Sequence, residues 1–272
     1  MKPVLIASIF FSATVFSCKQ PKNNSLEEAL SKGKWIDLTY SLSDSTLYWP
    51  NNPTGFILHT QANGITPAGF YYSSNSFSAP EHGGTHLDAP VHFAEGKHTA
   101  DQIPLENLTG FAVVIDVSEK ALKNPDYLVS VKDVADWEKV NDSIRQGSIV
   151  LFRTGYGQYY PNAKKYFGTA EKGATGIAQL HFPGIDASTA DWLVTKRKIK
   201  ALGLDTPSID YGQSKDFKTH QTLLGKNIPA FENVANLEQL PAKGAYVVAL
   251  PMKIKNGSGA PLRIVAWISN EN

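Results

Sequence analysis

The stretch EHGGTHLDAPVHF, residues 81–93, places three histidines and an aspartate within eleven positions, at His82, His86, Asp88 and His92. On a straight helix Asp88 would point away from His86, because successive side chains turn by about 100°. On a straight strand the four groups share a face, but at about 3.3 Å per residue they span about 33 Å. Only a curled loop brings them together, and Gly83-Gly84 permits the backbone conformations that a curl needs.

The chemistry of these side chains indicates a metal site. Imidazole nitrogens and a carboxylate oxygen suit Zn²⁺, Mn²⁺ or Fe²⁺ better than Ca²⁺ or Mg²⁺. A structural zinc site more often uses cysteine, and the single cysteine of the chain, Cys18, stands far from the motif. Three protein ligands with an open position are the usual arrangement of a catalytic metal. The motif therefore predicts a catalytic divalent ion; the alternative is a chance cluster of surface histidines.

The sequence HGGTHLDAPVHF also resembles the signature H-x-G-T-H-x-D-x-P-x-H-F of the metal-dependent cyclase family, which includes bacterial kynurenine formamidases and isatin hydrolases. The resemblance covers most of residues 34–270. It implies that His82, His86 and Asp88 bind metal and that His92 is the catalytic general acid and base.

Two further segments support the resemblance. GLDTPSIDYGQSKDFKTHQTLLGKNIPAFENV resembles the second half of the family, in which a histidine and a glutamate complete a two-metal site. The resemblance implies that these residues are His220 and Glu232 here, with Asp88 bridging the two metals. It also implies that the cofactor is Zn²⁺ or Mn²⁺, as one ion or two. LYWPNNP resembles the substrate-side segment and implies that Trp49 stacks on an aromatic substrate. Formamidases of the family usually have Gly-Asp after Trp-Pro, whereas this chain has Asn51-Asn52. This difference concerns the identity of the substrate more than the metal site.

Hydrophobic patterns predict one mixed α/β domain over residues 34–272. Strands are predicted at 35–43, 111–117 and 148–155, a helix at 130–147 and a second helix leading into a strand over 186–206. Residues 245–269 are predicted to form two strands that turn at Asn256-Gly257. The resemblance implies a central β-barrel-like mixed sheet with flanking helices, of the swivelling β/β/α type.

The N-terminal residues predict export. One early lysine, an apolar run shorter than a membrane span and the sequence VFSC are typical of a lipoprotein signal peptide. Residues 1–17 are therefore predicted to be the signal peptide, Cys18 the lipidated residue, and 18–33 a tether with a short helix. The alternative is an uncleaved signal or a buried helix. This interpretation places the protein on a bacterial membrane, facing the periplasm or the cell exterior.

A formal net charge of +1 gives no indication of nucleic-acid binding. We expect a metal-dependent amidohydrolase that acts, like an arylformamidase, on a small aromatic N-formyl or cyclic amide through a metal-activated water. Two alternatives are a non-catalytic metal- or ligand-binding lipoprotein and a lactone or cyclic-imide hydrolase. The resemblance also implies a homodimer or a larger homo-oligomer. Asp205 and Ser208 could reach the site or shape a buried turn, and the Tyr-rich loop 153–160 could line a pocket or pack locally.

Overall fold

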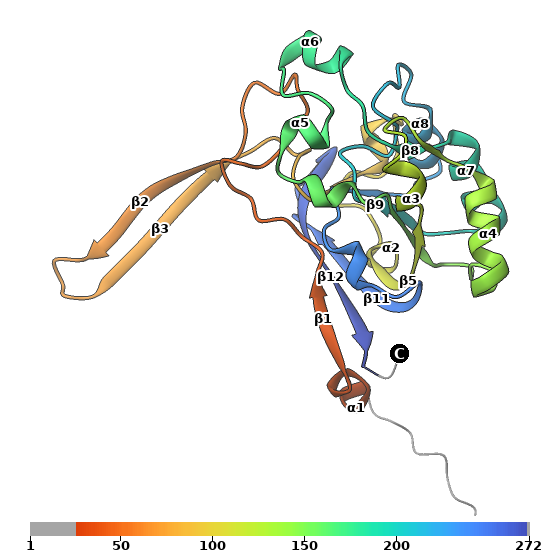
Figure 1. The fold of residues 1–272 in the computed structure, drawn as a ribbon. Helices are drawn as coiled ribbons and strands as arrows, with labels where there is room; N and C mark the ends of the chain where they lie inside the picture. Colours follow the sequence, from red (N-terminus) through yellow and green to blue (C-terminus); the bar gives the residue numbers. More distant parts are fainter. Residues whose placement is uncertain (1–25, 271–272) are drawn as a thin grey trace, which may run out of the picture.

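The computed structural model describes residues 26–270, which form a closed mixed barrel with helices outside it (Figure 1). The sheet order β1-β12-β11-β5-β7-β9-β10-β4 returns to β12 through a pairing between β4 and β12, so seven strands close into a ring and β1 pairs outside it. The predicted fold class is confirmed. The strands are β1 (Gly33–Asp37), β4 (His86–Asp88), β5 (Thr109–Asp116), β7 (Ile149–Arg153), β9 (Ala201–Leu204), β10 (Ala230–Glu232), β11 (Lys243–Pro251) and β12 (Gly259–Ser269).

Side chains that alternate along the barrel strands build two cores. Ala112 and Val114 of β5 pack inside the barrel, in one cluster with Leu87 of β4 and Phe231 of β10. Val113 and Ile115 of β5 lie in a second cluster on the outer face, together with helix residues. Strands β5, β7 and β9 are buried on both faces, so their sequences are continuous apolar runs. Their parallel pairing requires crossover connections, which carry the helices.

Helices α4 (Val131–Asn141), α7 (Ala187–Trp192) and α8 (Lys218–Leu224) contribute to the outer core, and a π-helical turn, η3 (Leu193–Arg197), continues α7. The Ser130 side chain caps α4 as predicted, but the predicted end at Gly147 is wrong. The helix ends at Asn141 because Asp142 has a positive φ of 66°. The remaining short helices are α1 (Leu26–Ser31), α2 (Leu105–Leu108), α3 (Ser118–Ala121), α5 (Ala163–Tyr166), α6 (Gly173–Ala178) and the 3₁₀ turns η1 (Pro90–His92), η2 (Tyr156–Tyr159) and η4 (Leu237–Gln239).

A two-stranded arm projects from the barrel and is formed by β2 (Ile57–Ile65) and β3 (Tyr71–Ser78) (Figure 1). Its strands pair only with each other. A second small sheet, β6 (Leu128–Val129) with β8 (Gly184–Ile185), lies beside the helices. The strand predicted at 35–43 ends at Asp37, because the chain leaves the sheet there and the Tyr40 N–H donates to the Thr85 hydroxyl, 2.9 Å away. The predicted C-terminal strand pair is confirmed.

The N-terminal predictions lie partly outside the described residues. The signal peptide 1–17 and Cys18 belong to the undescribed part of the chain, whereas α1 lies within the predicted tether and short helix. Over residues 26–270, no helix has the length and apolar character needed to cross a bilayer.

Candidate active site

One cavity of about 360 Å³ collects the predicted site residues of the described chain. It is lined by Trp49, His82, His86, Asp88, His92, His220 and Glu232. These residues come from the loop before the arm, from the predicted motif, and from α8 and β10. The structure therefore brings together side chains that stand up to 183 positions apart, from Trp49 to Glu232.

Strand alternation explains how β4 presents its ligands. Leu87 packs inside the barrel, so His86 and Asp88 on either side of it point to the outer face. The antiparallel register places Glu232 of β10 directly opposite His86, and Phe231 is again the inward residue. Three polar side chains therefore converge outside the barrel, each adjacent in sequence to a fully buried core residue.

Glycines shape the curl that leads into β4. Gly84 has a φ of 56°, a conformation that favours glycine. A Cβ on Gly83 would lie 2.1 Å from the Tyr48 ring, so no larger residue fits there. After the strand, Pro90 begins the 3₁₀ turn η1, and this turn brings His92 back over the site. The curl predicted from the sequence is present at Gly83-Gly84, but the prediction of a loop throughout is wrong: His86 and Asp88 lie on the strand β4, and His92 ends the 3₁₀ turn η1.

Two imidazoles face the carboxylates with the same nitrogen. The Nδ1 of His86 lies 3.0 Å from the carbonyl oxygen of Gly84, and its Nε2 lies 3.2 Å from Asp88 Oδ1 and 3.5 Å from Glu232 Oε2. The Nδ1 of His220 lies 2.6 Å from Asp210 Oδ2, and its Nε2 lies 3.1 Å from Asp88 Oδ2 and 3.2 Å from Glu232 Oε1. In both residues the outer nitrogen donates to an oxygen and the inner nitrogen faces the two carboxylates.

The electrostatics of this cluster attract positive charge. Burial opposes ionisation of Asp88, yet hydrogen bonds with His220 and His82 hold its pKa well below the usual range. Burial and the charge of Asp88 raise the pKa of Glu232. Burial disfavours the charged form of His220, but hydrogen bonds to Asp210, Asp88 and Glu232 raise its pKa well above the usual value. Such a donor set, with lone pairs converging from imidazoles and carboxylates, fits a divalent cation.

The structure offers two overlapping groups of possible metal ligands. One comprises His86, Asp88 and Glu232, and the other comprises His82, Asp88 and His92; within each group the ligand atoms lie within 4.8 Å of one another. Asp88 belongs to both groups, which is the geometry expected of a bridging carboxylate. The described residues therefore fit a divalent metal ion.

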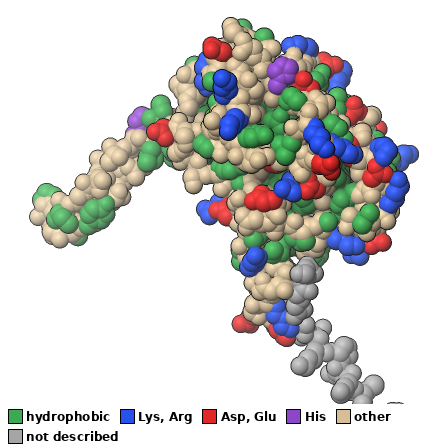
Figure 2. All heavy atoms as spheres, viewed as in Figure 1, with side chains coloured by type: hydrophobic (Ala, Val, Ile, Leu, Met, Phe, Trp, Pro, Cys, Tyr) green, Lys and Arg blue, Asp and Glu red, His purple; other side chains and the backbone are tan. Residues whose placement is uncertain are grey.

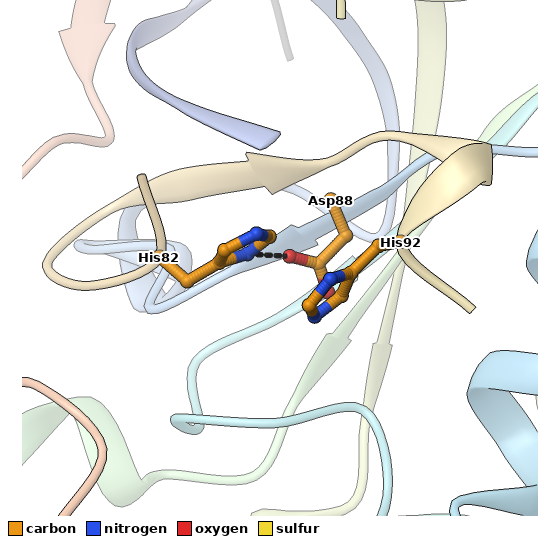
Figure 3. Close-up of side chains that lie close together, drawn as sticks. All are labelled: His82, Asp88 and His92. Atoms are coloured by element: carbon orange, nitrogen blue, oxygen red, sulfur yellow. Dashed lines mark hydrogen bonds and ion pairs between the residues drawn. The ribbon is translucent and has the colours of Figure 1, made fainter. Parts of the chain in front are cut away.

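In Figure 3 the rings of His92 and His82 both lie next to the Asp88 carboxylate. The His92 and His82 rings stack with centroids 3.9 Å apart, and the His92 ring lies edge-on to His220 at 6.2 Å. Burial lowers the pKa of His92 to about 4, so the ring is neutral at neutral pH. Its position fits the predicted proton carrier, and it also fits a further ligand.

Aromatic side chains form a large part of the remaining cavity wall. Trp49 contacts Phe217 with ring centroids 6.4 Å apart, Phe217 contacts Phe93 at 5.4 Å, and Phe93 contacts the ligand candidate His220 at 4.5 Å. Trp49 also packs edge-on against Phe182. Flat apolar surfaces next to a polar cluster suit a small planar ligand with one polar group.

Several residues left open by the sequence now have a place. Asp205 is buried and accepts hydrogen bonds from the backbone N–H groups of Thr154 and Gly155, so it shapes a turn. Ser208 lines the cavity. The residues of loop 153–160 do not line it, and Tyr160 instead stacks on Tyr40 at 3.8 Å.

Sequence reasoning missed the residues that orient the imidazoles. Asp210 holds His220, and Ser258 lies 2.8 Å from His82 Nε2 through its hydroxyl. For Asp210 a signal existed, because a carboxylate ten positions before a predicted histidine ligand suits the usual carboxylate–histidine–metal arrangement. For Ser258 no local pattern pointed to the site.

Comparison with known proteins agrees with this arrangement. Residues 36–211 match the family described as "Putative cyclase". The isatin hydrolase of Roseibium aggregatum is 31% identical over 208 residues, covering 74% of this chain and 76% of that protein. The kynurenine formamidase of Salinibacter ruber is 27% identical over 234 residues, covering 85% of this chain and 95% of that protein. A solved isatin hydrolase bound to the product analogue thioisatinate aligns with a TM-score of 0.80 and 27% identity, covering 88% of this chain and 94% of that one.

A barrel fold shared with such enzymes, together with a cluster of possible metal ligands, defines a metal-dependent amidohydrolase. The chain belongs to the cyclase family. The sequence predictions of family, fold and enzyme class are thereby confirmed.

Proposed function

We propose that the substrate of this hydrolase is a small aromatic amide, either an N-formyl amide or a cyclic amide, and that the carbon–nitrogen bond is cleaved by water. The observation that carries the proposal is one cavity in which the imidazole–carboxylate cluster adjoins Trp49, Phe93 and Phe217. The aromatic wall would bind the ring of the substrate, and the amide would then face the polar cluster.

We propose Zn²⁺ or Mn²⁺ as the metal, with two ions at full occupancy. By the family resemblance, His82, His86 and Asp88 would hold the first ion, and His220 and Glu232 the second, with Asp88 shared between them. The support is that the Asp88 carboxylate lies within 3.2 Å of a ring nitrogen of each of the three histidines. When bound, the metal supplies an activated water and polarises the substrate carbonyl.

The side chains around the metal carry out the proton transfers. His92, which is neutral at neutral pH, takes the proton from the attacking water and returns it to the leaving nitrogen. Phe93 and Phe217 place apolar surface beside the polar cluster, which would strengthen the electrostatic interactions within the site. Trp49 orients the aromatic ring so that the amide carbon lies near the polar cluster.

Between the two amide classes, a cyclic amide has specific support. Asn51 and Asn52 stand where the formamidases usually have Gly-Asp, and both line the cavity. The identity to the isatin hydrolase, 31%, also exceeds that to the kynurenine formamidase, 27%. We therefore expect ring opening of isatin to exceed hydrolysis of N-formylkynurenine.

The test is hydrolysis of both compounds, and of an aromatic lactone and a cyclic imide, by residues 19–272. The protein is assayed as purified, after chelation and after Zn²⁺ or Mn²⁺ is restored. Activity on an amide that is lost with chelator and regained with metal supports the proposal and identifies a working ion. Metal-loaded protein that opens only the lactone or the imide contradicts the amide proposal, and inactivity on all four compounds favours a binding protein.

We also propose that the protein is an exported lipoprotein, anchored through Cys18 to a bacterial membrane and facing the periplasm or the cell exterior. The support is the N-terminal sequence, together with the polar segment that connects it to α1. Labelling of the full-length chain with a fatty-acid analogue in bacteria tests this, and Cys18→Ala should abolish the label. Label retained by that variant contradicts the proposed anchor.

A homodimer is proposed on the basis of the arm. No Lys, Arg, Asp or Glu stands between Asp44 and Glu81, and the arm residues Phe70, Tyr71 and Tyr72 are exposed. In Figure 2 the end of the arm is hydrophobic and uncharged. An isolated two-stranded ribbon is marginally stable in water, so a second copy is its expected support. Sedimentation of residues 19–272 tests this, and a purely monomeric species contradicts it.

A further inference from the structure

Ser258 lies in the turn between β11 and β12 and contacts both ends of the metal motif. Its hydroxyl lies 2.8 Å from His82 Nε2 and donates to Glu81 Oε2 over 2.6 Å. Its backbone N–H donates to the same carboxylate oxygen over 3.0 Å. Its carbonyl oxygen accepts from the N–H of Ala89, 2.9 Å away. A single residue from a distant segment is therefore hydrogen-bonded to the motif at two places, at Glu81 before His82 and at Ala89 after Asp88.

The direction of these hydrogen bonds determines which nitrogen of His82 carries hydrogen. A hydroxyl has one hydrogen, and the ionised Glu81 carboxylate can only accept, so that hydrogen goes to Glu81. The Ser258 oxygen must then accept from His82 Nε2–H. The other nitrogen, Nδ1, faces Asp88 Oδ1 at 2.7 Å. It is the nitrogen that would give up its hydrogen to a metal ion, while Nε2 keeps its hydrogen on the Ser258 oxygen.

His82 is oriented opposite to the other two imidazoles of the cluster. His86 and His220 direct Nδ1 outward and Nε2 toward the carboxylates, whereas His82 directs Nε2 outward and Nδ1 inward. We infer that Ser258 and Glu81 are a positioning pair that makes His82 an Nδ1 ligand of the metal. This inference rests on the proposed role of His82 as a ligand, and it extends the site to the C-terminal turn.

Packing around the turn leaves His82 little freedom to rotate. Gly259 pairs with Asp88 across the β4–β12 ladder. A Cβ at Gly259 would lie 2.5 Å from His82 Cε1 and 2.5 Å from the carbonyl oxygen of Leu87. The absence of a side chain there allows the ring to lie against the strand, with Nε2 directed at the serine. Barrel closure and ring orientation therefore depend on the same two residues of β12 and its turn.

The test measures metal binding without turnover. Residues 19–272 are stripped of metal, and Zn²⁺ affinity is determined by competition with a chromophoric chelator. Ser258→Ala removes the acceptor of His82 and should weaken binding of one ion by roughly 10- to 100-fold. Ser258→Thr keeps the hydroxyl and should restore affinity to near that of the unmodified chain. Glu81→Ala frees the hydroxyl to donate elsewhere and should cause a smaller loss.

A matched control perturbs the same turn without touching His82. Asp101 accepts from the backbone N–H of Asn256, 3.0 Å away, and from the Thr99 hydroxyl. Asp101→Asn should leave Zn²⁺ affinity unchanged. A loss as large as that of Ser258→Ala would show that turn position matters rather than the hydroxyl, and would overturn the inference. Circular dichroism and thermal melting of the metal-free variants establish that each one is folded.

A spectroscopic measurement reads the ligating nitrogen directly. Nitrogen-15 NMR of histidine-labelled, Zn²⁺-loaded protein should show His82 bound through Nδ1, with Nε2 protonated. Coordination through Nε2, or unchanged affinity in Ser258→Ala, overturns the inference. A chain that shows Nδ1 ligation yet hydrolyses no amide leaves this inference standing and contradicts only the proposed substrate class.

Discussion

Replacement of Asp210 by asparagine tests how the second ion would be held. Asp210 Oδ2 lies 2.6 Å from His220 Nδ1 and also accepts from the His220 backbone N–H at 3.1 Å, while Oδ1 accepts from the N–H of Thr219 at 3.1 Å. Both carboxylate oxygens are therefore acceptors. In Asp210→Asn one of them becomes an NH₂ group that faces N–H donors, so at least one buried donor loses its partner.

The expected cost follows from the contact. A buried hydrogen bond to a charged group contributes about 1.5–3 kcal/mol, which corresponds to roughly 10- to 150-fold in an equilibrium constant. Because His220 is the proposed ligand of the second ion only, Asp210→Asn should lower the affinity for one of two Zn²⁺ equivalents by that factor. The first equivalent should bind nearly as in the unmodified chain. Chelator competition gives both affinities, and elemental analysis gives the occupancy.

The control is a second Asp–His pair on the surface. Asp126 Oδ1 lies 2.9 Å from His181 Nδ1, and both side chains are partly exposed. Asp126→Asn makes the same chemical change outside the cavity and should alter neither equivalent. If both ions bind Asp210→Asn as tightly as the unmodified chain, His220 does not depend on Asp210 and the reasoning is refuted.

Three further predictions concern catalysis, substrate binding and stability. His92→Ala should abolish turnover while elemental analysis still finds the metal, and loss of the metal would instead make His92 a ligand. Trp49→Ala should raise KM for an aromatic amide roughly 3- to 10-fold with kcat little changed, and an unchanged KM would contradict stacking. Asp133→Ala, which breaks the capping box of α4, should destabilise the fold by about 1–2 kcal/mol near neutral pH. Burial disfavours the ionised Asp133, but hydrogen bonds from Lys120 and Ser130 lower its pKa, so this difference in urea unfolding should shrink as pH falls below about 4.

The motif could be predicted because its information is local. His82, His86, Asp88 and His92 stand within eleven positions, and Gly83-Gly84 encodes the curl beside them. A reader of the sequence therefore sees the ligands and the reason for their convergence in one stretch. The continuous apolar strands were accessible for a similar reason, because burial on both faces is visible in the strand itself.

Other features depend on contacts that no local pattern carries. His220 and Glu232 were found by resemblance alone, since a single histidine and a single glutamate carry little signal. Ser258 reaches His82 across 176 positions because β12 closes the barrel against β4. The end of α4 was misplaced because an amphipathic pattern continues to Ile144, which is buried from a loop after the helix has ended at Asn141. Ile144 therefore has the sequence spacing of a buried helix residue although it belongs to a loop.

The division between strands and loops in this site has a consequence for specificity. The proposed metal ligands His86, Asp88 and Glu232 stand on β4 and β10 next to core residues, so a change in their positions would disturb the barrel interior. Trp49 and Asn51 precede the arm on a loop that does not pair with the barrel. Loops tolerate substitution better than core strands do. A family built on this plan can therefore alter the amide it accepts while the metal cluster stays fixed. Asn51 and Asn52, which line the cavity and are not buried, are where such a change would have the least cost to the fold.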